Sequence, residues 1–336
     1  MLLWLEFITC SGIIIVCGTN LSKYGDIISE KTGFGRAWIG LILLASITSL
    51  PELVTGVSSV SFAGLPNLTA GDILGSCVFN LLILAMLDPM DKSSPIFSRV
   101  GQSHLLSGGF GVLLIGISAV SMLLGGSIPS VGHIGLYTPV ILIAYAVGIR
   151  AVYLYEKRFI DRLAAEAMEK PMYPEATLRK AALMYAVNAV IVVAVALALP
   201  FIAGRLAVTT GLGTTFMGTV FVAVTTSLPE VVVSVSAVRM GAPDLAIGNL
   251  FGSNMFNIVI LAIDDILYLK GPLFSNISKA HAPTALMAIL MTAVALIGLT
   301  YRHDKKAFLR FGWDSVTMLA IGVLTVYFQY MMLGER

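Results

Sequence analysis

Two short stretches of this chain place a carboxylate beside hydroxyls and a proline in apolar surroundings. Ser49–Glu52 (SLPE) recurs 178 positions later as Ser227–Glu230. An ionisable residue at membrane depth is costly to bury, so its presence indicates a function by default. Carboxylate and hydroxyl oxygens are the ligands that hard cations prefer. The repeated pattern therefore indicates a cation site built by an internal repeat.

Each copy is followed by a second matching stretch. Gly64–Asn80 (GLPNLTAGDILGSCVFN) aligns with Gly241–Asn257 (GAPDLAIGNLFGSNMFN), 177 positions later. In both stretches two glycines have the small-xxx-small spacing that allows close helix approach. A serine and an asparagine follow, four residues apart and so on one helical face. These residues are Gly71, Gly75, Ser76 and Asn80 in the first copy, and Gly248, Gly252, Ser253 and Asn257 in the second.

Helical geometry gathers the polar groups of the SLPE segments as well. Thr48 and Glu52 are four residues apart and share a helical face, as do Thr226 and Glu230. Pro51 has no N–H to give to the carbonyl four residues earlier, and it pushes the helix apart there. A carbonyl freed inside a membrane needs a partner, and a cation is one such partner.

An isolated proline kink would not by itself indicate a binding site. Such kinks are commonly structural, and Ser or Thr hydroxyls often bond back to their own helix. Here the kink, the glutamate and the following Gly/Ser/Asn stretch occur twice, which favours a ligand site. Neither copy holds a histidine or cysteine cluster, so the ligand set is oxygen. Oxygen ligands select Na⁺, Ca²⁺, Mg²⁺ or Mn²⁺ over zinc or copper.

The composition predicts a membrane protein. Hydrophobic residues make up 57% of the 336 residues, charged residues only 12%, and the mean hydropathy is +0.91. A soluble domain has about a quarter charged residues. A spanning helix needs about 20 mainly apolar residues. Ten stretches meet this requirement, near 2–22, 38–63, 66–87, 103–125, 132–153, 181–203, 211–239, 244–268, 281–300 and 313–333.

Basic residues predict the orientation. With the N-terminus outside, seventeen Lys and Arg residues fall in cytoplasmic connections and four on the other side. The positive-inside rule then places the linker 154–180 in the cytoplasm and both termini outside, in an integral protein of the plasma membrane. Because these charges border membrane spans, the partner they indicate is the lipid bilayer and not nucleic acid.

The linker divides the chain almost in half. Five expected spans lie in 1–153, which contains the motif region 45–80, and five lie in 181–336, which contains the motif region 223–257. An odd number of crossings makes the second half enter the membrane from the opposite side. The expected fold is an all-α polytopic membrane protein of ten transmembrane helices, arranged as two inverted five-helix repeats.

The paired motif, TSLPE followed by GxxxGSxxxN, resembles the α-repeats of the cation/calcium exchanger superfamily, and most closely those of prokaryotic sodium/calcium exchangers. The resemblance implies ten helices, in which helices two, three, seven and eight form a core and helices one and six act as a sliding gate. It also implies a ligand set for the transported ions. This set is Glu52, Glu230, Thr48, Ser49, Thr226, Ser227, Ser76, Asn80, Ser253 and Asn257, with backbone carbonyls at Ala45 and Ala223.

Some positions depart from the family pattern. The first copy has Asp72 where the family usually has the asparagine that the second copy keeps as Asn249. Asn257 is an amide where some relatives carry an aspartate. The residue before the Thr-Ser pair is usually glycine but is Ile47 in one copy and Thr225 in the other.

The favoured interpretation is a Na⁺/Ca²⁺ antiporter that works by alternating access and needs no cofactor. Two glutamates carry a charge of −2, which one Ca²⁺, two Na⁺ or two protons would neutralise. An H⁺/Ca²⁺ or other cation/proton antiporter is therefore the first alternative. A cation channel and a membrane scaffold with a vestigial site are the others. A channel normally repeats its filter by oligomeric symmetry, and a scaffold has no reason to keep polar residues in both halves. An enzyme is disfavoured because the four histidines show no metal spacing.

Overall fold

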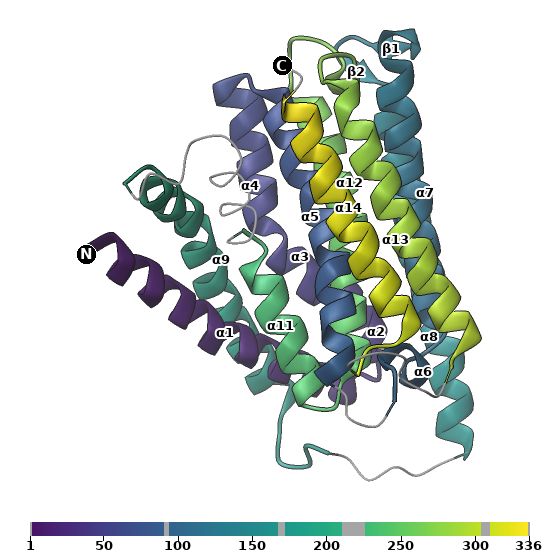
Figure 1. Ribbon diagram of the computed structural model, residues 1–336. Coiled ribbons are helices and arrows are strands. Elements are labelled where there is room, and N and C mark those ends of the chain that lie inside the picture. The colour runs from purple at the N-terminus through teal and green to yellow at the C-terminus, as the bar shows by residue number, and fades with distance from the viewer. Residues whose placement is uncertain (1, 91–93, 167–171, 210–225, 304–309, 335–336) are drawn as a thin grey trace. The chain divides into compact units, whose positions relative to one another are not determined.

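The computed structural model describes residues 2–90, 94–166, 172–209, 226–303 and 310–334 as an almost entirely helical chain (Figure 1). The sheet within these residues is one small hairpin. Its strands β1 (Ser130–Val131) and β2 (Ile134–Gly135) pair antiparallel around Gly132, whose φ of +63° suits a glycine. The all-helical class predicted from the sequence is thus confirmed, apart from this turn.

Seven helices in the described part of the chain are long and apolar enough to cross a membrane. They are α1 (Leu2–Thr32), α5 (Pro66–Leu87), α7 (Ser103–Leu124), α8 (Tyr137–Glu166), α9 (Leu178–Thr209), α12 (Pro243–Leu267) and α13 (Ala282–Tyr301). A bent pair would be an eighth span. It consists of α2 (Arg36–Ile39), the π-helix η1 (Gly40–Leu44), α3 (Ala45–Thr48), α4 (Leu50–Ser58) and the π-helix η2 (Ser59–Ala63). The protein is an integral membrane protein, as its composition predicts.

Two of the ten expected spans are not among these eight. The span near 211–239 is described only from residue 226, as α11 (Leu228–Arg239), because 210–225 lie outside the described residues. The last span is α14 (Trp313–Gly334), whose apolar part Trp313–Phe328 is shorter than the others. The count of ten helices therefore stays a prediction. Short helices complete the described elements: η3 (Asp88–Met90), α6 (Ile96–Arg99), η4 (Gly125–Ser127), η5 (Leu273–Ser275) and η6 (Lys279–His281).

The chain divides into two compact units. The first contains residues up to Pro51 together with Arg150–Gly252. In it α1 packs along α9 and α11, around the buried side chains of Ile14, Ala196 and Val232. A Cβ at Gly18 would lie 2.8 Å from Val232 Cγ1, so the glycine allows α1 to approach α11 closely.

The second unit contains Glu52–Ile149 and Ser253–Arg336. In it α13 packs against α7, α5 and α14, and α14 also packs against α5 (Figure 1). The interior is apolar, with fully buried leucines on α5 and fully buried Met291 on α13. Each unit takes residues from both sequence halves, so the compact units and the repeated halves are different divisions of the chain.

Two buried aspartates organise the loops of the second unit. Asp88 follows α5 and accepts a hydrogen bond from the Ile96 backbone N–H at 2.8 Å. Asp265, near the end of α12, accepts one from the Leu273 N–H at 2.6 Å. In both cases the donor lies eight residues after the carboxylate, and the two aspartates are themselves 177 positions apart. The same loop structure therefore follows both copies of the motif.

The second carboxylate oxygens of Asp88 and Asp265 also have donors at equivalent positions of the two copies. Asp88 Oδ2 accepts from the Gly312 N–H at 2.5 Å, and Asp265 Oδ2 accepts from the Gly135 N–H at 2.9 Å. The two glycines are again 177 positions apart. Asp265 also accepts hydrogen bonds from the Tyr137 and Thr138 hydroxyls. Both carboxylates are fully buried, so these donors offset the cost of removing the charges from water.

The two loops lie at opposite ends of the unit. Helix α13 starts shortly after the loop that Asp265 fastens. It ends at Tyr301, and Arg302 then donates from Nη2 to the Val100 carbonyl, in the connection that follows Asp88, at 2.7 Å. The 20 residues of α13 span about 30 Å, which matches the hydrocarbon core of a bilayer. Equivalent loops of the two copies are therefore separated by the length of a membrane span.

Candidate functional site

The second expected span is broken at its SLPE segment. Ser49 has φ −91° and ψ 9°, which are not helical values, and the flanking helices bend by 42° at this point. Pro51 in the following turn cannot donate an N–H, which explains why the break lies here. Ser227 has nearly the same conformation, φ −84° and ψ 8°, directly before α11. The helix interruption predicted from Pro51 is confirmed, and the second copy has the same turn at its serine.

In the first unit, residues from both copies of the motif meet. Ser49 Oγ donates to Glu230 Oε1 at 3.3 Å, although the two residues are 181 positions apart. Glu230 is only 1% exposed, and its other oxygen, Oε2, has no hydrogen-bond partner among the described residues. The Thr48 side chain also hydrogen-bonds to this carboxylate, which still has acceptor capacity that two hydroxyls do not satisfy.

An amide connects the hydroxyls around this carboxylate. Thr48 Oγ1 lies 3.3 Å from Asn249 Oδ1, and Asn249 Nδ2 donates to Ser234 Oγ at 3.1 Å. Thr48 Oγ1 also lies 3.4 Å from the Ala45 carbonyl. The side chains of Thr48, Asn249 and Ser234 are fully buried. The network holds Thr48 on α3 against α12, on the helical turn next to Ser49.

The second unit contains the other glutamate. Glu52 is 1% exposed, and its Oε1 accepts a hydrogen bond from Ser76 Oγ at 3.4 Å. Both residues belong to the first copy of the motif, one on α4 and the other on α5. The spacing of the two motif segments thus does bring the predicted Glu52 and Ser76 together.

Three buried amides lie in this unit. Asn80 Nδ2 donates to Asn254 Oδ1 at 3.0 Å, and Asn254 Nδ2 donates to the Cys77 carbonyl at 3.2 Å. Asn257 Nδ2 lies 3.8 Å from Cys77 Sγ. The Oδ1 atoms of Asn80 and Asn257 have no hydrogen-bond partner within the described part of the chain. Asn254 was not predicted as a site residue, and its place directly after the predicted ligand Ser253 was the available signal.

The other predicted ligand residues that the structure describes are also buried. Ala45, Thr226, Ser227 and Ser253 are buried, and Ser227 Oγ has no hydrogen-bond partner among the described residues. The carbonyl of Ala45 accepts from the Ser49 N–H at 3.0 Å, so it takes part in the turn. Ala223 lies outside the described residues.

The buried oxygen atoms around Glu230 in the first unit, and those of Glu52, Asn80 and Asn257 in the second, are of the kind that bind a hard cation. Buried acceptors without donors cost free energy, and three of them are Glu230 Oε2, Asn80 Oδ1 and Asn257 Oδ1. A bound Na⁺ or Ca²⁺ satisfies such oxygens, because both ions take carboxylate, carbonyl and amide ligands.

Glycines bring α12 very close to the broken span within the first unit. A Cβ at Gly40 would lie 2.5 Å from the Leu245 carbonyl oxygen, and one at Gly252 would lie 2.5 Å from the Leu41 carbonyl oxygen. Gly248 faces a backbone carbonyl at the same distance. The close approach predicted for Gly248 and Gly252 is confirmed. It is not seen at Gly75, where a Cβ would meet no described atom within 4 Å.

Two aspartates in the second unit were not predicted to lie near each other. Asp264 is fully buried, and its Oδ2 accepts from Thr69 Oγ1 at 3.1 Å. Asp72 is close enough to act on it electrostatically. A Cβ at Gly56 would lie 2.5 Å from Asp264 Oδ2, so the glycine leaves room for this carboxylate. The second copy has an amide and a serine, Asn249 and Ser234, in place of Asp72 and Gly56.

Curated proteins with related sequences include an inner membrane protein, a sodium/calcium exchanger and a putative antiporter. The inner membrane protein YrbG of Escherichia coli is 27% identical over 251 residues, which cover 74% of each chain. The sodium/calcium exchanger MaX1 of Methanosarcina acetivorans is 39% identical over 109 residues, 32% of this chain and 29% of that protein. A putative antiporter, CaxA of Alkalimonas amylolytica, is 23% identical over 80% of this chain and 82% of its own.

Solved structures share the fold. The sodium-calcium exchanger NCX_Mj, soaked with 10 mM Na⁺ and no Ca²⁺, aligns with a TM-score of 0.74 at 19% identity, over 97% of this chain and 98% of its own. The same protein soaked with 2.5 mM Na⁺ and 0.1 mM Ca²⁺ gives a TM-score of 0.75 over the same shares. A profile of the family described as "Sodium/calcium exchanger protein" matches residues 2–154 and 180–333, which is nearly everything outside the linker. The chain therefore belongs to the sodium/calcium exchanger protein family, whose members are membrane transporters and not enzymes.

Proposed function

We propose that this protein is a secondary active antiporter that exchanges Na⁺ for Ca²⁺ across the membrane by alternating access. The observation that carries the proposal is the contact between Ser49 of the first copy and the buried carboxylate of Glu230 in the second. A fully buried glutamate held by two hydroxyls lacks a compensating charge among the groups described, and a transported cation supplies one. The family membership and the match to MaX1 support Na⁺ and Ca²⁺ as the ions.

The two motif glutamates explain how the Na⁺ and Ca²⁺ fluxes would be coupled. Together Glu52 and Glu230 carry −2, which one Ca²⁺ or two Na⁺ would balance. An uncompensated charge inside the protein costs several kcal/mol, so the occupied state crosses only when it is neutral or nearly so. Competition of the two ions for the same carboxylates then couples their opposing fluxes, with no cofactor involved.

We assign the ligand roles that the motif implies. The carboxylates are the charged ligands, and hydroxyls, amides and two backbone carbonyls complete the oxygen shell. The full set is Glu52, Glu230, Thr48, Ser49, Thr226, Ser227, Ser76, Asn80, Ser253, Asn257, Ala45 and Ala223. The buried oxygens of Glu230, Asn80 and Asn257 that lack partners support it.

The proposed architecture is ten helices in two inverted repeats. The loops fastened by Asp88 and Asp265 support inversion, because equivalent loops of the two copies lie about 30 Å apart at opposite ends of one helix bundle. If the copies ran in the same direction through the membrane, these two loops would share one side.

We place the linker 154–180 in the cytoplasm of a plasma-membrane protein and both termini outside. Contacts within the first unit support a common side for the linker and the first connection. The Tyr173 hydroxyl donates to Asp26 at 2.9 Å, and the Met172 N–H donates to Glu30 at 2.8 Å. Both segments are rich in Lys and Arg, as the positive-inside rule requires of cytoplasmic connections.

The decisive experiment measures Ca²⁺ uptake into proteoliposomes that contain the purified full-length chain. The vesicles are loaded with Na⁺, with K⁺ or with an acidic buffer in turn. Uptake that depends on internal Na⁺, and that Glu230→Gln abolishes, is the expected result. Glu175→Gln, which removes the same charge from an exposed linker residue, is the matched control. Uptake driven only by the pH gradient would replace Na⁺ by H⁺ as the coupling ion, and uptake without any gradient partner would indicate a channel.

A further inference from the structure

Two aspartates of the second unit have no part in the proposed exchange site. Asp264 on α12 is fully buried, and its Oδ2 accepts a hydrogen bond from Thr69 Oγ1 on α5 at 3.1 Å. Its other oxygen, Oδ1, has no hydrogen-bond partner among the described residues. The same is true of Oδ2 of Asp72, an atom that is buried although its residue is partly exposed. One hydroxyl therefore serves one carboxylate oxygen and leaves two buried acceptors unsatisfied.

Helical geometry turns Asp72 toward Asp264. Thr69 and Asp72 are three residues apart on α5, so they share a helical face. Because the Thr69 hydroxyl contacts the Asp264 carboxylate, this face of α5 is the one that meets the last turns of α12. Asp72 lies one turn further along α5 and is close enough to act on Asp264 electrostatically.

The pair lacks a compensating charge within the described part of the chain. No basic side chain there pairs with either carboxylate or acts on it electrostatically. His281 approaches this part of α5, but its Nε2 contacts Asn67 Oδ1 at 3.2 Å. Two like charges in a low dielectric repel each other, and each is costly to bury alone. A divalent cation removes both costs, because it neutralises the pair and coordinates the free oxygens.

A glycine leaves room beside the Asp264 carboxylate. A Cβ at Gly56 on α4 would lie 2.5 Å from Asp264 Oδ2 and 3.1 Å from Thr69 Oγ1. Any side chain at this position would therefore displace the carboxylate or the hydroxyl. The backbone of α4 thus closes one side of the pair without filling the space that its oxygens occupy.

The arrangement is specific to one end of the molecule. The four residues that form it are Thr69, Asp72, Gly56 and Asp264, and their equivalents in the other copy of the motif are Ala246, Asn249, Ser234 and Leu87. None of these equivalents is charged. The internal repeat therefore does not produce a second such pair, and whatever the pair binds is bound on one side of the membrane.

The pair continues the helix faces of the proposed ligands toward that end. Asp72 precedes Ser76 by four residues, which is about 6 Å along α5. Asp264 follows Asn257 by seven residues, about 10 Å along α12. Asp264 also directly precedes Asp265, which fastens the loop at this end. In the proposed orientation this loop faces the outside, so the pair lies between the outer surface and the proposed ligands of the second unit.

We propose that Asp72 and Asp264 form a second, outer binding site for a divalent cation of the Ca²⁺ type. The two carboxylates supply a charge of −2 and the free oxygens, and the Thr69 hydroxyl orients Asp264. The site holds Ca²⁺ on its way between the outer surface and Glu52. This role rests on the proposed exchange function, whereas the binding of the cation does not.

A purely structural explanation accounts for less. A hydrogen bond between Thr69 and Asp264 would fasten α5 to α12, as polar side chains do between other membrane helices. It would not require a second carboxylate nearby, and it would leave Oδ1 of Asp264 and Oδ2 of Asp72 without partners. Threonine with asparagine would fasten the helices equally well and would bury no charge.

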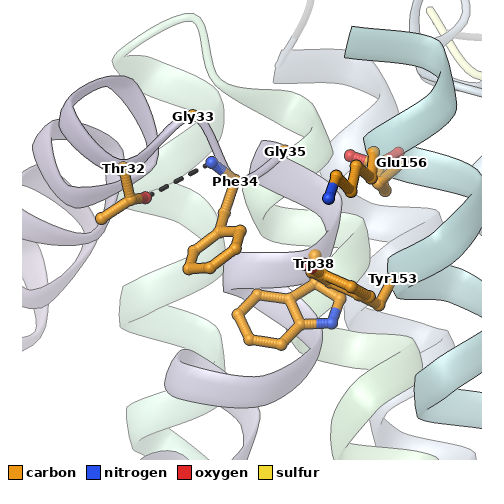
Figure 2. Close-up of a pocket in the computed structure, with 8 residues that line it drawn as sticks. Thr32, Gly33, Phe34, Gly35, Trp38, Tyr153 and Glu156 are labelled. Carbon is orange, nitrogen blue, oxygen red and sulfur yellow. Dashed lines mark hydrogen bonds between the residues drawn. The ribbon is translucent and has the colours of Figure 1, made fainter. Parts of the chain in front are cut away.

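A pocket of about 370 Å³ in the first unit makes no comparable demand for an ion (Figure 2). Its rings of Phe34, Trp38 and Tyr153 pack on one another, with centroids 4.8, 5.7 and 6.0 Å apart. Its carboxylate, Glu156, has an interaction partner, and its Lys157 is exposed to solvent. The described lining of this pocket therefore leaves no buried charge to compensate, unlike the aspartate pair.

The test measures Mn²⁺ binding to the purified full-length chain in detergent by electron paramagnetic resonance. Mn²⁺ takes the same oxygen ligands as Ca²⁺, and its unbound fraction is measured directly. The parent chain carries Glu52→Gln and Glu230→Gln, so the proposed exchange site has lost its charges. Asp72→Asn or Asp264→Asn is then added, which removes one charge of the outer pair and keeps the side-chain shape.

Two glycine variants test the geometry without changing a charge. Gly56→Ala keeps both carboxylates but places a methyl group against Asp264. Gly109→Ala is the matched control, since a Cβ at Gly109 would meet no described atom within 4 Å. Thermal unfolding in chelator shows that each variant is folded. Asp72→Asn changes only a partly exposed residue, so it reports on the site even if Asp264→Asn prevents folding.

A single Mn²⁺ ion, displaced by Ca²⁺, is expected on the parent chain and on Gly109→Ala. Binding should be about tenfold weaker or more with Asp72→Asn or Asp264→Asn, and weaker also with Gly56→Ala. Unchanged binding with either asparagine variant would overturn the proposal. A parent chain that binds no Mn²⁺ at neutral and alkaline pH would also overturn it, because protons alone would then occupy the pair.

Sidedness separates this inference from the exchange function. In an otherwise wild-type chain, Asp264→Asn should raise several-fold the Ca²⁺ concentration for half-maximal transport from the outside, measured in intact cells. Transport from the cytoplasmic side, measured in inverted vesicles, should need the same concentration as before. An equal change on both sides would refute an outer site. A wild-type chain without Na⁺-dependent Ca²⁺ transport would refute the exchange function but not the Mn²⁺ site.

Discussion

Replacing Glu230 by glutamine tests the proposed cation site most directly. The side chain is 1% exposed, its Oε1 accepts from Ser49 at 3.3 Å, and its Oε2 has no hydrogen-bond partner among the described residues. Glutamine has nearly the same shape and can still accept the serine hydrogen bond. The substitution therefore removes one negative charge and changes the packing very little.

The size of the effect follows from the burial. Removing one partner of a buried charge pair costs about 3–5 kcal/mol. At 1.4 kcal/mol per factor of ten, Ca²⁺ should bind at least about 100-fold more weakly. At a Ca²⁺ concentration of 100 times the wild-type Kd, the ion stabilises the wild-type fold by about 2.7 kcal/mol. The same concentration is then at most about one Kd for the variant, and the stabilisation falls to about 0.4 kcal/mol or less.

Thermal unfolding of the purified protein in detergent, with chelator and with Ca²⁺, measures this difference without any transport assay. In chelator, Glu230→Gln should unfold at a higher temperature than the wild type, because it no longer buries an uncompensated charge. Glu175→Gln should behave as the wild type in both conditions, since Glu175 is exposed. A Glu230→Gln variant that keeps the full Ca²⁺-dependent stabilisation would refute the assignment of this carboxylate as a ligand.

Three further outcomes are expected. Ser49→Ala removes a hydrogen bond to a charged group, worth about 1.5–3 kcal/mol, and should weaken Ca²⁺ binding in the same thermal assay by about tenfold or more, less than Glu230→Gln; an unchanged Kd would contradict the contact. Asp265→Asn leaves fewer acceptors for its four donors and should lower the free energy of unfolding by about 1–3 kcal/mol in denaturant titrations with or without Ca²⁺. In a cysteine-free background, Glu175→Cys should react with impermeant thiol reagents only in inverted vesicles and Lys270→Cys only in intact cells; labelling of both from one side would remove the basis for an inverted second half.

The sequence predicted the break in the second span better than the contacts of the residues around it. The proline in the SLPE segment predicted where the helix opens, because its missing N–H acts only on the preceding turn. The pairing of Ser49 with Glu230 joins residues 181 positions apart, and no spacing rule predicts such a contact. Asn254 escaped prediction for a related reason. It occupies the place of Cys77 in the first copy, so a comparison of the copies gave no polar residue there.

The glycine spacing led to close packing of described residues in the second copy. Gly252 lies against the Leu41 backbone, whereas a side chain at Gly75 would meet no described atom within 4 Å. The spacing of two glycines allows a helix to approach its neighbour closely. Asp72, which stands where the family pattern has asparagine, was visible in the sequence. Its neighbour Asp264 was not, because the two residues are nearly 200 positions apart.

The Asp88 contacts also bear on how the chain is made. Asp88 needs the N–H of Gly312, which is synthesised 224 residues after it, whereas Asp265 needs that of Gly135, which already exists when Asp265 leaves the ribosome. The first loop therefore lacks its Gly312 donor until 224 more residues are made, whereas the Gly135 donor of the second loop is already present. A nascent chain that stops before Gly312 keeps a buried carboxylate short of a donor. We expect a chain truncated before Gly312 to lack this anchor on the loop after Asp88, while the loop after Asp265 keeps its Gly135 anchor.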